Sequence, residues 1–110
     1  MLNNTTWKDK FQSEIDHAES ARALGNEGKS RVCARRAAGI VAYQYLSQAG
    51  LTPASSSAVV NLKFLYSHPG LPEPVREIIS HFLQHVSEDF RLPEGVDLIM
   101  DARQLADELL

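Results

Sequence analysis

Several features that mark other classes of protein are missing from this chain of 110 residues. It has one cysteine, Cys33, so it cannot form an internal disulfide, and the simplest compartment for it is the cytosol. No apolar run approaches the roughly 20 residues that cross a bilayer, and the first residues, MLNNTTWKDK, lack the apolar core of a signal peptide. We therefore expect a cytoplasmic protein without a membrane partner.

Motifs that identify common enzymes are missing as well. The stretch GNEGKS (residues 25–30) superficially resembles the end of a phosphate-binding loop, but its spacing is wrong and no buried strand precedes it. No Ser/His/Asp arrangement can be recognised. Cys33 has arginines nearby that could activate a nucleophile, but it stands among small apolar residues in VCARRAAG, which favours a buried packing position. The sequence therefore favours a protein that is not an enzyme, and it indicates no cofactor.

The apolar residues of every long segment repeat with a helical period, and no segment shows sustained strand alternation. The composition, 44% apolar and 23% charged, is ordinary for a globular protein, and a chain of this length forms one domain, residues 1–110. We expect an all-α fold, a four- to five-helix up-and-down bundle. The first helix should begin at Thr5 or Thr6 with Asp9 in a capping box, and a turn at residues 25–28 should join it to an antiparallel partner.

The second helix should run from about Lys29 to Gln48, and it is apolar on most of its circumference, so we expect it to be central. A third helix should open at Thr52-Pro53. After a proline-rich loop at residues 68–74, a fourth helix is expected over residues 75–90 and is broken by residues 91–95. A fifth should be capped near Asp97.

The distribution of charge is the most informative property of the sequence. The stretch from Arg22 to Arg36, called here the basic segment, holds five basic residues and one acid, a net charge of +4. The rest of the chain holds six basic and thirteen acidic residues, a net charge of −7. This distribution of charge therefore fits a local anion-binding site better than a surface that binds nucleic acid over its whole extent. The candidate ligand-binding residues are Lys29, Arg31, Arg35 and Arg36. Their charged end of the helix is expected to face solvent.

The predicted fourth helix carries the candidate catalytic residues. Arg76 could hold a phosphate and His81 could move a proton, a pair that suits metal-free RNA cleavage. They would point about 140° apart on a helix, so they would have to line a cleft from two sides, most simply at a dimer interface. His81, His85 and Glu88 could together form a metal edge, but no third strong ligand is indicated elsewhere, and we expect no metal site.

The order of elements resembles that of the HEPN (higher eukaryotes and prokaryotes nucleotide-binding) domain family. The resemblance is carried by LPEPVREIISHFLQHV (71–86), FRLP (90–93) and DARQLADELL (101–110). Arg91 and Pro93 match the arginine-aromatic-proline turn of the family, with Leu92 in place of the usual tyrosine, and Asp101-Ala102 matches the opening of the last helix. The match covers nearly the whole chain, as a pattern with few invariant residues.

The resemblance implies a helical bundle that is commonly a homodimer. The family includes partners of minimal nucleotidyltransferases, nucleotide-binding modules and toxin-type RNases of toxin–antitoxin pairs. Its RNases carry an arginine, a polar residue and a histidine four to six residues on. Arg76 and His81 fit that count, but Glu77 departs from the usual second residue and would repel RNA phosphate.

Three functional hypotheses follow. The leading one is a non-catalytic HEPN-like module that binds a nucleotide or RNA, or serves as the partner subunit of a minimal nucleotidyltransferase. The second is a toxin-type RNase that uses Arg76 and His81. The third is a purely structural subunit in which the basic segment pairs with acids of the first helix, such as Glu14, Asp16 and Glu19. We also expect a homodimer, because the chain has more aromatic surface than a thin bundle can easily cover, at Tyr43, Phe64, Tyr66 and Phe90.

Overall fold

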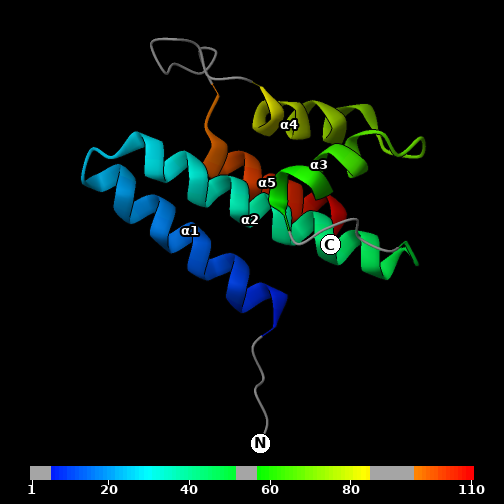
Figure 1. The fold of residues 1–110 in the computed structure, drawn as a ribbon, viewed down its shortest axis with the longest axis horizontal. Helices are drawn as coiled ribbons and strands as arrows, with labels where there is room; N and C mark the ends of the chain where they lie inside the picture. Colours follow the sequence, from blue (N-terminus) through cyan, green and yellow to red (C-terminus); the bar gives the residue numbers. More distant parts are fainter. Residues whose placement is uncertain (1–5, 52–56, 85–95) are drawn as a thin grey trace, which may run out of the picture.

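The computed structural model describes residues 6–51, 57–84 and 96–110, and all regular structure in these ranges is helical. The all-α class is therefore confirmed. The described helices are shown in Figure 1 and have these bounds: α1 Trp7–Ala23, α2 Glu27–Gln48, α3 Ala58–Tyr66, α4 Glu73–Leu83 and α5 Leu98–Leu109.

Local side-chain caps set the beginnings of most of these helices. The Thr6 hydroxyl accepts the amide of Asp9 at 3.3 Å while the Asp9 carboxylate accepts the amide of Thr6 at 3.3 Å, so the predicted capping box is confirmed. Asn26 caps α2 by accepting the amide of Lys29 at 3.1 Å, and α2 therefore begins at Glu27, two residues before the predicted start. The predicted cap at Asp97 is also confirmed, with the Ile99 amide at 3.0 Å.

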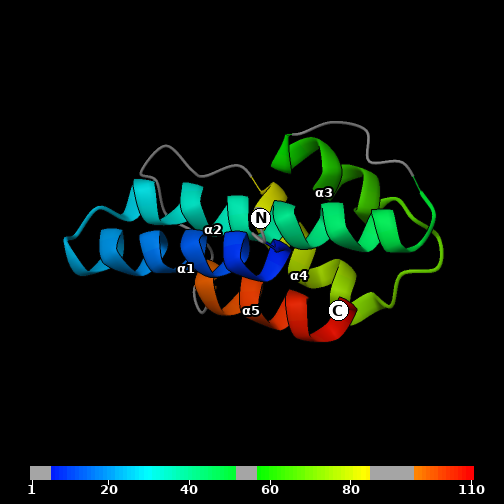
Figure 2. The same ribbon diagram turned by 90° about the horizontal axis from the view of Figure 1, so that it is seen from below.

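The central position of α2 follows from its small residues. It packs against α1, α3 and α5, and Figures 1 and 2 show α1 lying antiparallel beside it. Cys33 is buried at 3% exposure, which confirms its predicted packing position. Gly39 lies where α3 begins, and a Cβ built on it would overlap the Ala58 side chain and lie 2.7 Å from the Ala58 Cα. Only glycine allows the two backbones to come this close.

One core holds the helices together. Every described helix contributes to it, and its largest fully buried side chains come from all five: Ile15, Leu46, Leu62, Leu65, Ile79, Phe82, Leu98 and Leu105. Burial of this apolar surface is the main force that stabilises the bundle. The site described below lies outside this core, on the side of α2 that faces α1 and α3.

Two described helices differ in extent from the predicted ones. α3 begins at Ala58, where the Ser57 hydroxyl accepts the amide of Val60 at 3.4 Å; the predicted opening at Thr52-Pro53 lies outside the described residues. α4 ends at Leu83 because Gln84 has an extended backbone, with φ −69° and ψ 141°, although a helix through residue 90 was predicted. Residues 85–90 are outside the described part of the chain.

The directions of the helices depart from a simple alternation. α1 and α2 are antiparallel, and α4 and α5 also run in opposite directions (Figures 1 and 2). α3, however, runs in the same general direction as α2. The alternation of an up-and-down bundle is therefore interrupted between α2 and α3, and this arrangement places the beginning of α3 against the middle of α2.

Candidate functional site

Arg22, the first cation of the basic segment, has a structural role. Its guanidinium donates to both carboxylate oxygens of Asp97, at 3.1 and 3.2 Å. Burial alone raises the pKa of Asp97, but the hydrogen bond and charge of Arg22 and the amides of Met100 and Ile99 outweigh it and hold the pKa below its ordinary value. The pair ties the end of α1 to the beginning of α5 and leaves Arg22 unavailable to a ligand.

Arg35 is also used inside the fold. Its Nε donates to the main-chain oxygen of Phe82 at 3.1 Å, near the end of α4. Burial and then the neighbouring charge of Arg31 lower the pKa of Arg35. Arg35 was expected to face solvent, but it is half-buried and the fold uses one of its donors; its part in an anion site stays a prediction. A cation is favourable at a helix C-terminus. In a longer helix, the Phe82 carbonyl that accepts the Arg35 hydrogen bond would instead accept one from the amide four residues further along the chain. This contact gives a physical reason for the early end of α4.

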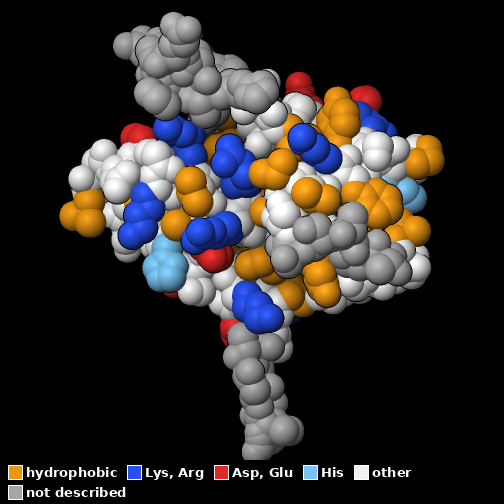
Figure 3. Space-filling view, in the orientation of Figure 1, with side chains coloured by type: hydrophobic (Ala, Val, Ile, Leu, Met, Phe, Trp, Pro, Cys, Tyr) orange, Lys and Arg blue, Asp and Glu red, His pale blue; other side chains and the backbone are white. Residues whose placement is uncertain are grey.

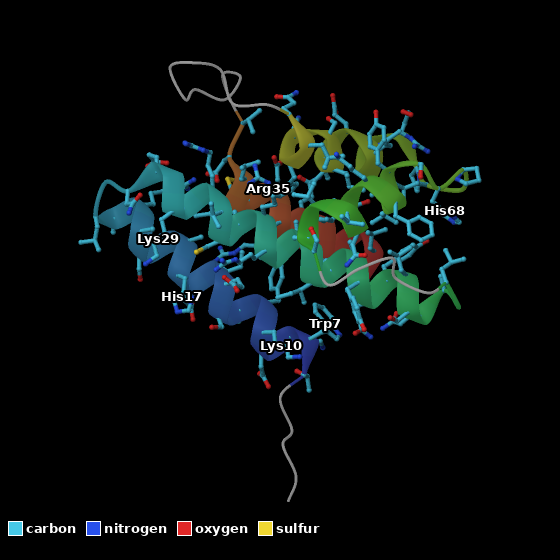
Figure 4. The ribbon with its side chains drawn as sticks, viewed as in Figure 1. Trp7, Lys10, His17, Lys29, Arg35 and His68 are labelled. Carbon is cyan, nitrogen blue, oxygen red and sulfur yellow. The ribbon has the colours of Figure 1, made fainter. Side chains whose placement is uncertain are left out.

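The other three cations of the basic segment are Lys29, Arg31 and Arg36, and they are not used by the described fold. In the part of the chain that the structure describes, their side chains have no ion pair and no hydrogen bond with protein groups. Lys29 and Arg36 are exposed and Arg31 is half-buried. Figure 3 shows Lys and Arg side chains gathered over α1 and α2 on this face, where few acidic side chains are seen, and Figure 4 shows Lys29 at the start of α2.

Among the described residues, the acids of α1 form no ion pair with Lys29, Arg31 or Arg36. Glu19 pairs with Arg103 of α5 at 3.3 Å, and Asp16 accepts a hydrogen bond from Gln12 at 2.9 Å. Glu14 has a buried Oε1 atom with no hydrogen-bond partner. The internal pairing that a purely structural role requires is therefore not formed by Glu14, Asp16 or Glu19.

A pocket of about 470 Å³ is lined by Arg36, one of these three cations. It lies between α1, α2 and α3, and its lining includes Glu14, Arg36, Gly39, Tyr43, Ala58 and Asn61. A second pocket of about 390 Å³ is lined by Trp7, Lys10, Ile40, Tyr43 and Gln44. Ile40 and Tyr43 line both, so the two pockets are neighbours along α2, and together they are called here the groove beside α2. Sequence reasoning missed this groove because its residues come from three helices.

Arg76, the first candidate catalytic residue, is held by protein groups. Its Nη atoms donate to the main-chain oxygens of Tyr66, His68 (3.2 Å) and Leu71 (3.5 Å), and its Nε lies 3.4 Å from a Glu73 carboxylate oxygen. The guanidinium carbon also lies 5.3 Å from the centre of the Tyr66 ring. These contacts fix the connection between α3 and α4 and occupy the donors that would bind a phosphate.

His81 lies on α4 against α5. Its Nδ1 is 2.8 Å from Oδ2 of Asp101, and both side chains are largely buried, at 24% and 15% exposure. A carboxylate on one ring nitrogen orients an imidazole, as in acid–base sites. The sequence pattern did not indicate Asp101 as a partner of His81, and the packing of α4 on α5 is what reveals the pair. Arg76 contacts a different part of the fold, so the structure does not bring the two candidates to one site.

The predicted metal edge can be followed only in part. His85 and Glu88 lie outside the described residues, and within the described ranges no three His, Cys, Asp or Glu side chains gather to hold a metal ion. None of the helices described here is both long and apolar enough to cross a membrane.

Comparisons with known proteins do not place the chain in a family. No family model matches it, and neither the curated proteins nor the solved structures gave a match. The resemblance to the HEPN family therefore rests on the sequence pattern alone.

Proposed function

We propose that this chain is a non-catalytic, HEPN-like helical module that binds a phosphate-bearing ligand, a nucleotide or RNA, through Lys29, Arg31 and Arg36. The observation that carries the proposal is that these three cations have no protein partner in the described residues, while Arg22 and Arg35 of the same segment do. Guanidinium groups that the fold leaves without a protein partner suit the bidentate recognition of phosphate.

The groove beside α2 supports the same proposal. Arg36 lines one of its pockets and Lys10 lines the other, and Tyr43 borders both. Sites that bind single-stranded nucleic acid combine cations that follow the phosphates with aromatic rings on which bases stack. An acidic protein partner, such as a minimal nucleotidyltransferase, would use the cations but would have no need of the pockets.

The test is the binding of single-stranded RNA and of nucleoside monophosphates, measured by fluorescence anisotropy or calorimetry as salt is raised. The Arg31→Gln/Arg36→Gln variant should bind more weakly than the parent. For RNA, the slope of log K against log salt should fall by about 1.4, or about 0.7 for each phosphate that the protein no longer neutralises. Lys63→Gln/Arg103→Gln removes the same charge from α3 and α5 and should keep the parental slope. A parent that binds neither ligand at low salt, or a control that weakens equally, would refute the proposal.

A toxin-type RNase is the second candidate, and the contact between His81 and Asp101 is the observation that favours it. The engagement of Arg76 by main-chain carbonyls is the observation against it. Cleavage of RNA in the presence of a chelator that is abolished by His81→Asn would support this candidate. Cleavage that the variant retains would come from another source.

A further inference from the structure

The exposed side of α2 carries two cations and an aromatic ring at a regular spacing. Between residues 29 and 43, the exposed residues of α2 are Lys29, Val32, Arg36 and Tyr43. Lys29, Arg36 and Tyr43 follow one another at intervals of seven residues. A helical residue lies only about 20° around the axis from the residue seven positions before it. These three side chains therefore form one line along the helix, called here the α2 stripe.

The length of the α2 stripe is that of a short strand of nucleic acid. Seven residues of α-helix advance about 10.5 Å, so the stripe extends about 21 Å from Lys29 to Tyr43. Successive phosphates of a stacked strand are about 3.4 Å apart along its axis. The stripe therefore matches about six stacked nucleotides, or fewer when the strand is extended. A mononucleotide is too short to reach both ends.

The groove beside α2 adds a second ring and a third cation at the Tyr43 end of the stripe. Tyr43 exposes 49% of its surface and lines both pockets, and the second pocket is also lined by Trp7 and Lys10 of α1. Figure 4 shows Lys29 near the turn that joins α1 to α2, and Trp7 and Lys10 at the opposite end of α1. The pockets, of about 470 and 390 Å³, have the size of small-ligand sites, so each has room for a base.

The charge of this surface favours an anion. Glu14 is the acid that lines the first pocket, and one of its carboxylate oxygens, Oε1, is buried. Three cations, Lys29, Arg36 and Lys10, outnumber it, and all three are exposed. Figure 3 shows few acidic side chains over this part of α1 and α2. A row of like charges attracts a ligand that carries the opposite charge at several positions.

The rings and pockets distinguish among such ligands. An acidic peptide would use the cations but has no need of the pockets. In a duplex the bases cover one another's flat faces, and double-stranded RNA is recognised mostly through its shape and backbone. A single strand offers both a chain of phosphates and open base faces, and the stacking of bases on aromatic side chains tolerates every base.

We infer that the α2 stripe and the groove together bind a single-stranded oligonucleotide of about six nucleotides. Its phosphates follow Lys29, Arg36 and Lys10. Its bases enter the groove, where they stack on Tyr43 and Trp7. The inference rests on the proposed function and adds that the ligand is a strand, in place of a free nucleotide or a duplex. The chemistry is shared by RNA and DNA, and parallel titrations with hexamers of each distinguish the two.

The first experiment varies the length of the ligand on the unmodified protein. Calorimetric titration with UMP and with oligouridylates of increasing length should show affinity that rises up to about six nucleotides and little thereafter. The hexamer should bind more tightly than UMP by roughly tenfold or more, since a second stacked base alone contributes about 5-fold to 100-fold. Equal binding of UMP and the hexamer would overturn the inference and leave the proposed function intact. Absence of all nucleotide and RNA binding would refute both.

The second experiment compares ligands of other kinds at the same salt concentration. A strand of mixed sequence should bind at least about tenfold more tightly than the same strand annealed to its complement, and than polyglutamate of equal charge. Trp7 is the only tryptophan of the chain and lines the second pocket, so its emission should change with the single strand and stay unchanged with inorganic pyrophosphate, which has no base. Equal binding of the duplex would overturn the inference. Equal binding of polyglutamate would overturn it in favour of an acidic protein partner.

The third experiment changes the ring and the cation that the groove contributes. Tyr43→Leu should weaken binding of the hexamer by roughly 5-fold to 100-fold, whereas Tyr66→Leu, the same substitution at the end of α3, should not. Lys10→Gln should lower the slope of log K against log salt for the hexamer by about 0.7, and Lys63→Gln on α3 should keep the parental slope. Lys10 is exposed, so its variant tests the inference even if Tyr43→Leu fails to fold. Parental binding and slope in the Lys10 variant would overturn the inference, as would parental binding by a folded Tyr43 variant.

Discussion

Replacement of Gly39 by alanine tests the close contact that forms the floor of the pocket. The new Cβ would overlap the Ala58 side chain and lie 2.7 Å from its Cα, a main-chain atom that cannot rotate away. α3 must then move outward by about 1 Å, and overpacking of this kind costs roughly 2–3 kcal/mol. Alanine returns about 1 kcal/mol of helix propensity, so the free energy of unfolding should fall by about 1–2 kcal/mol.

Urea denaturation measures this loss directly, and thermal unfolding should show a Tm lower by roughly 5–15 °C for a domain of this size. Gly28→Ala, in the first turn of the same helix, is the matched control. A Cβ there meets no atom closer than 3.9 Å, so this variant should be as stable as the parent or more stable, by up to about 1 kcal/mol. Adding Ala58→Gly to Gly39→Ala should recover part of the loss, because it removes the overlap between side chains and leaves that with Cα. A Gly39→Ala protein at least as stable as the parent would contradict the close approach of α2 and α3.

Three further predictions concern other parts of the molecule. Arg35→Gln should lower the free energy of unfolding by about 1–3 kcal/mol, because the Phe82 carbonyl loses its charged donor. Arg31→Gln should change the free energy of unfolding little. Equal losses for the two variants in urea denaturation would contradict the role of Arg35 at the end of α4. The carboxylate of Asp97 should stabilise the fold above about pH 4, and this stabilisation should be lost as the pH falls through its lowered folded-state pKa. Asp97→Asn should therefore make the free energy of unfolding depend less on pH in the acid range, while Asp107→Asn should not. An unchanged pH dependence in Asp97→Asn would show that the lowered pKa has no consequence for folding. The homodimer stays a prediction. Tyr43 and Tyr66 expose 49% and 38% of their surface, whereas Phe64 packs against the core and Phe90 lies outside the described residues. Light scattering at tens of micromolar (an order-of-magnitude choice) should show twice the mass of the chain, and a monomer would count against the prediction.

The features that were predicted well from the sequence depend on neighbours along the chain. The helical period, the capping box of Thr6 and Asp9 and the cap at Asp97 involve residues at most a few positions apart. The central position of α2 was also predicted, because a helix with small residues on several sides can be approached from each of them. These signals are local and need no knowledge of the tertiary fold.

The features that were not predicted depend on partners far along the chain. Arg35 contacts Phe82, 47 residues away, and this contact accounts for an end of α4 that no glycine or proline marks. The pairing of His81 with Asp101 likewise needs the packing of α4 on α5. Charge counting identified the basic segment as a whole, but only tertiary contacts divide it into Arg22 and Arg35, which contact protein groups, and the cations that have no partner among the described residues.

The position of α2 between α1, α3 and α5 has a consequence for how the protein emerges from the ribosome. The α1–α2 hairpin joins neighbouring segments and can form early, since local contacts close at little entropic cost. The side of α2 that α5 covers must wait for the last residues of the chain, and the pair of Arg22 with Asp97 joins positions 75 residues apart. A nascent or truncated chain that lacks α5 therefore exposes the surface of α2 that α5 covers in the folded protein, and such a chain is the form that chaperones would bind or that would aggregate.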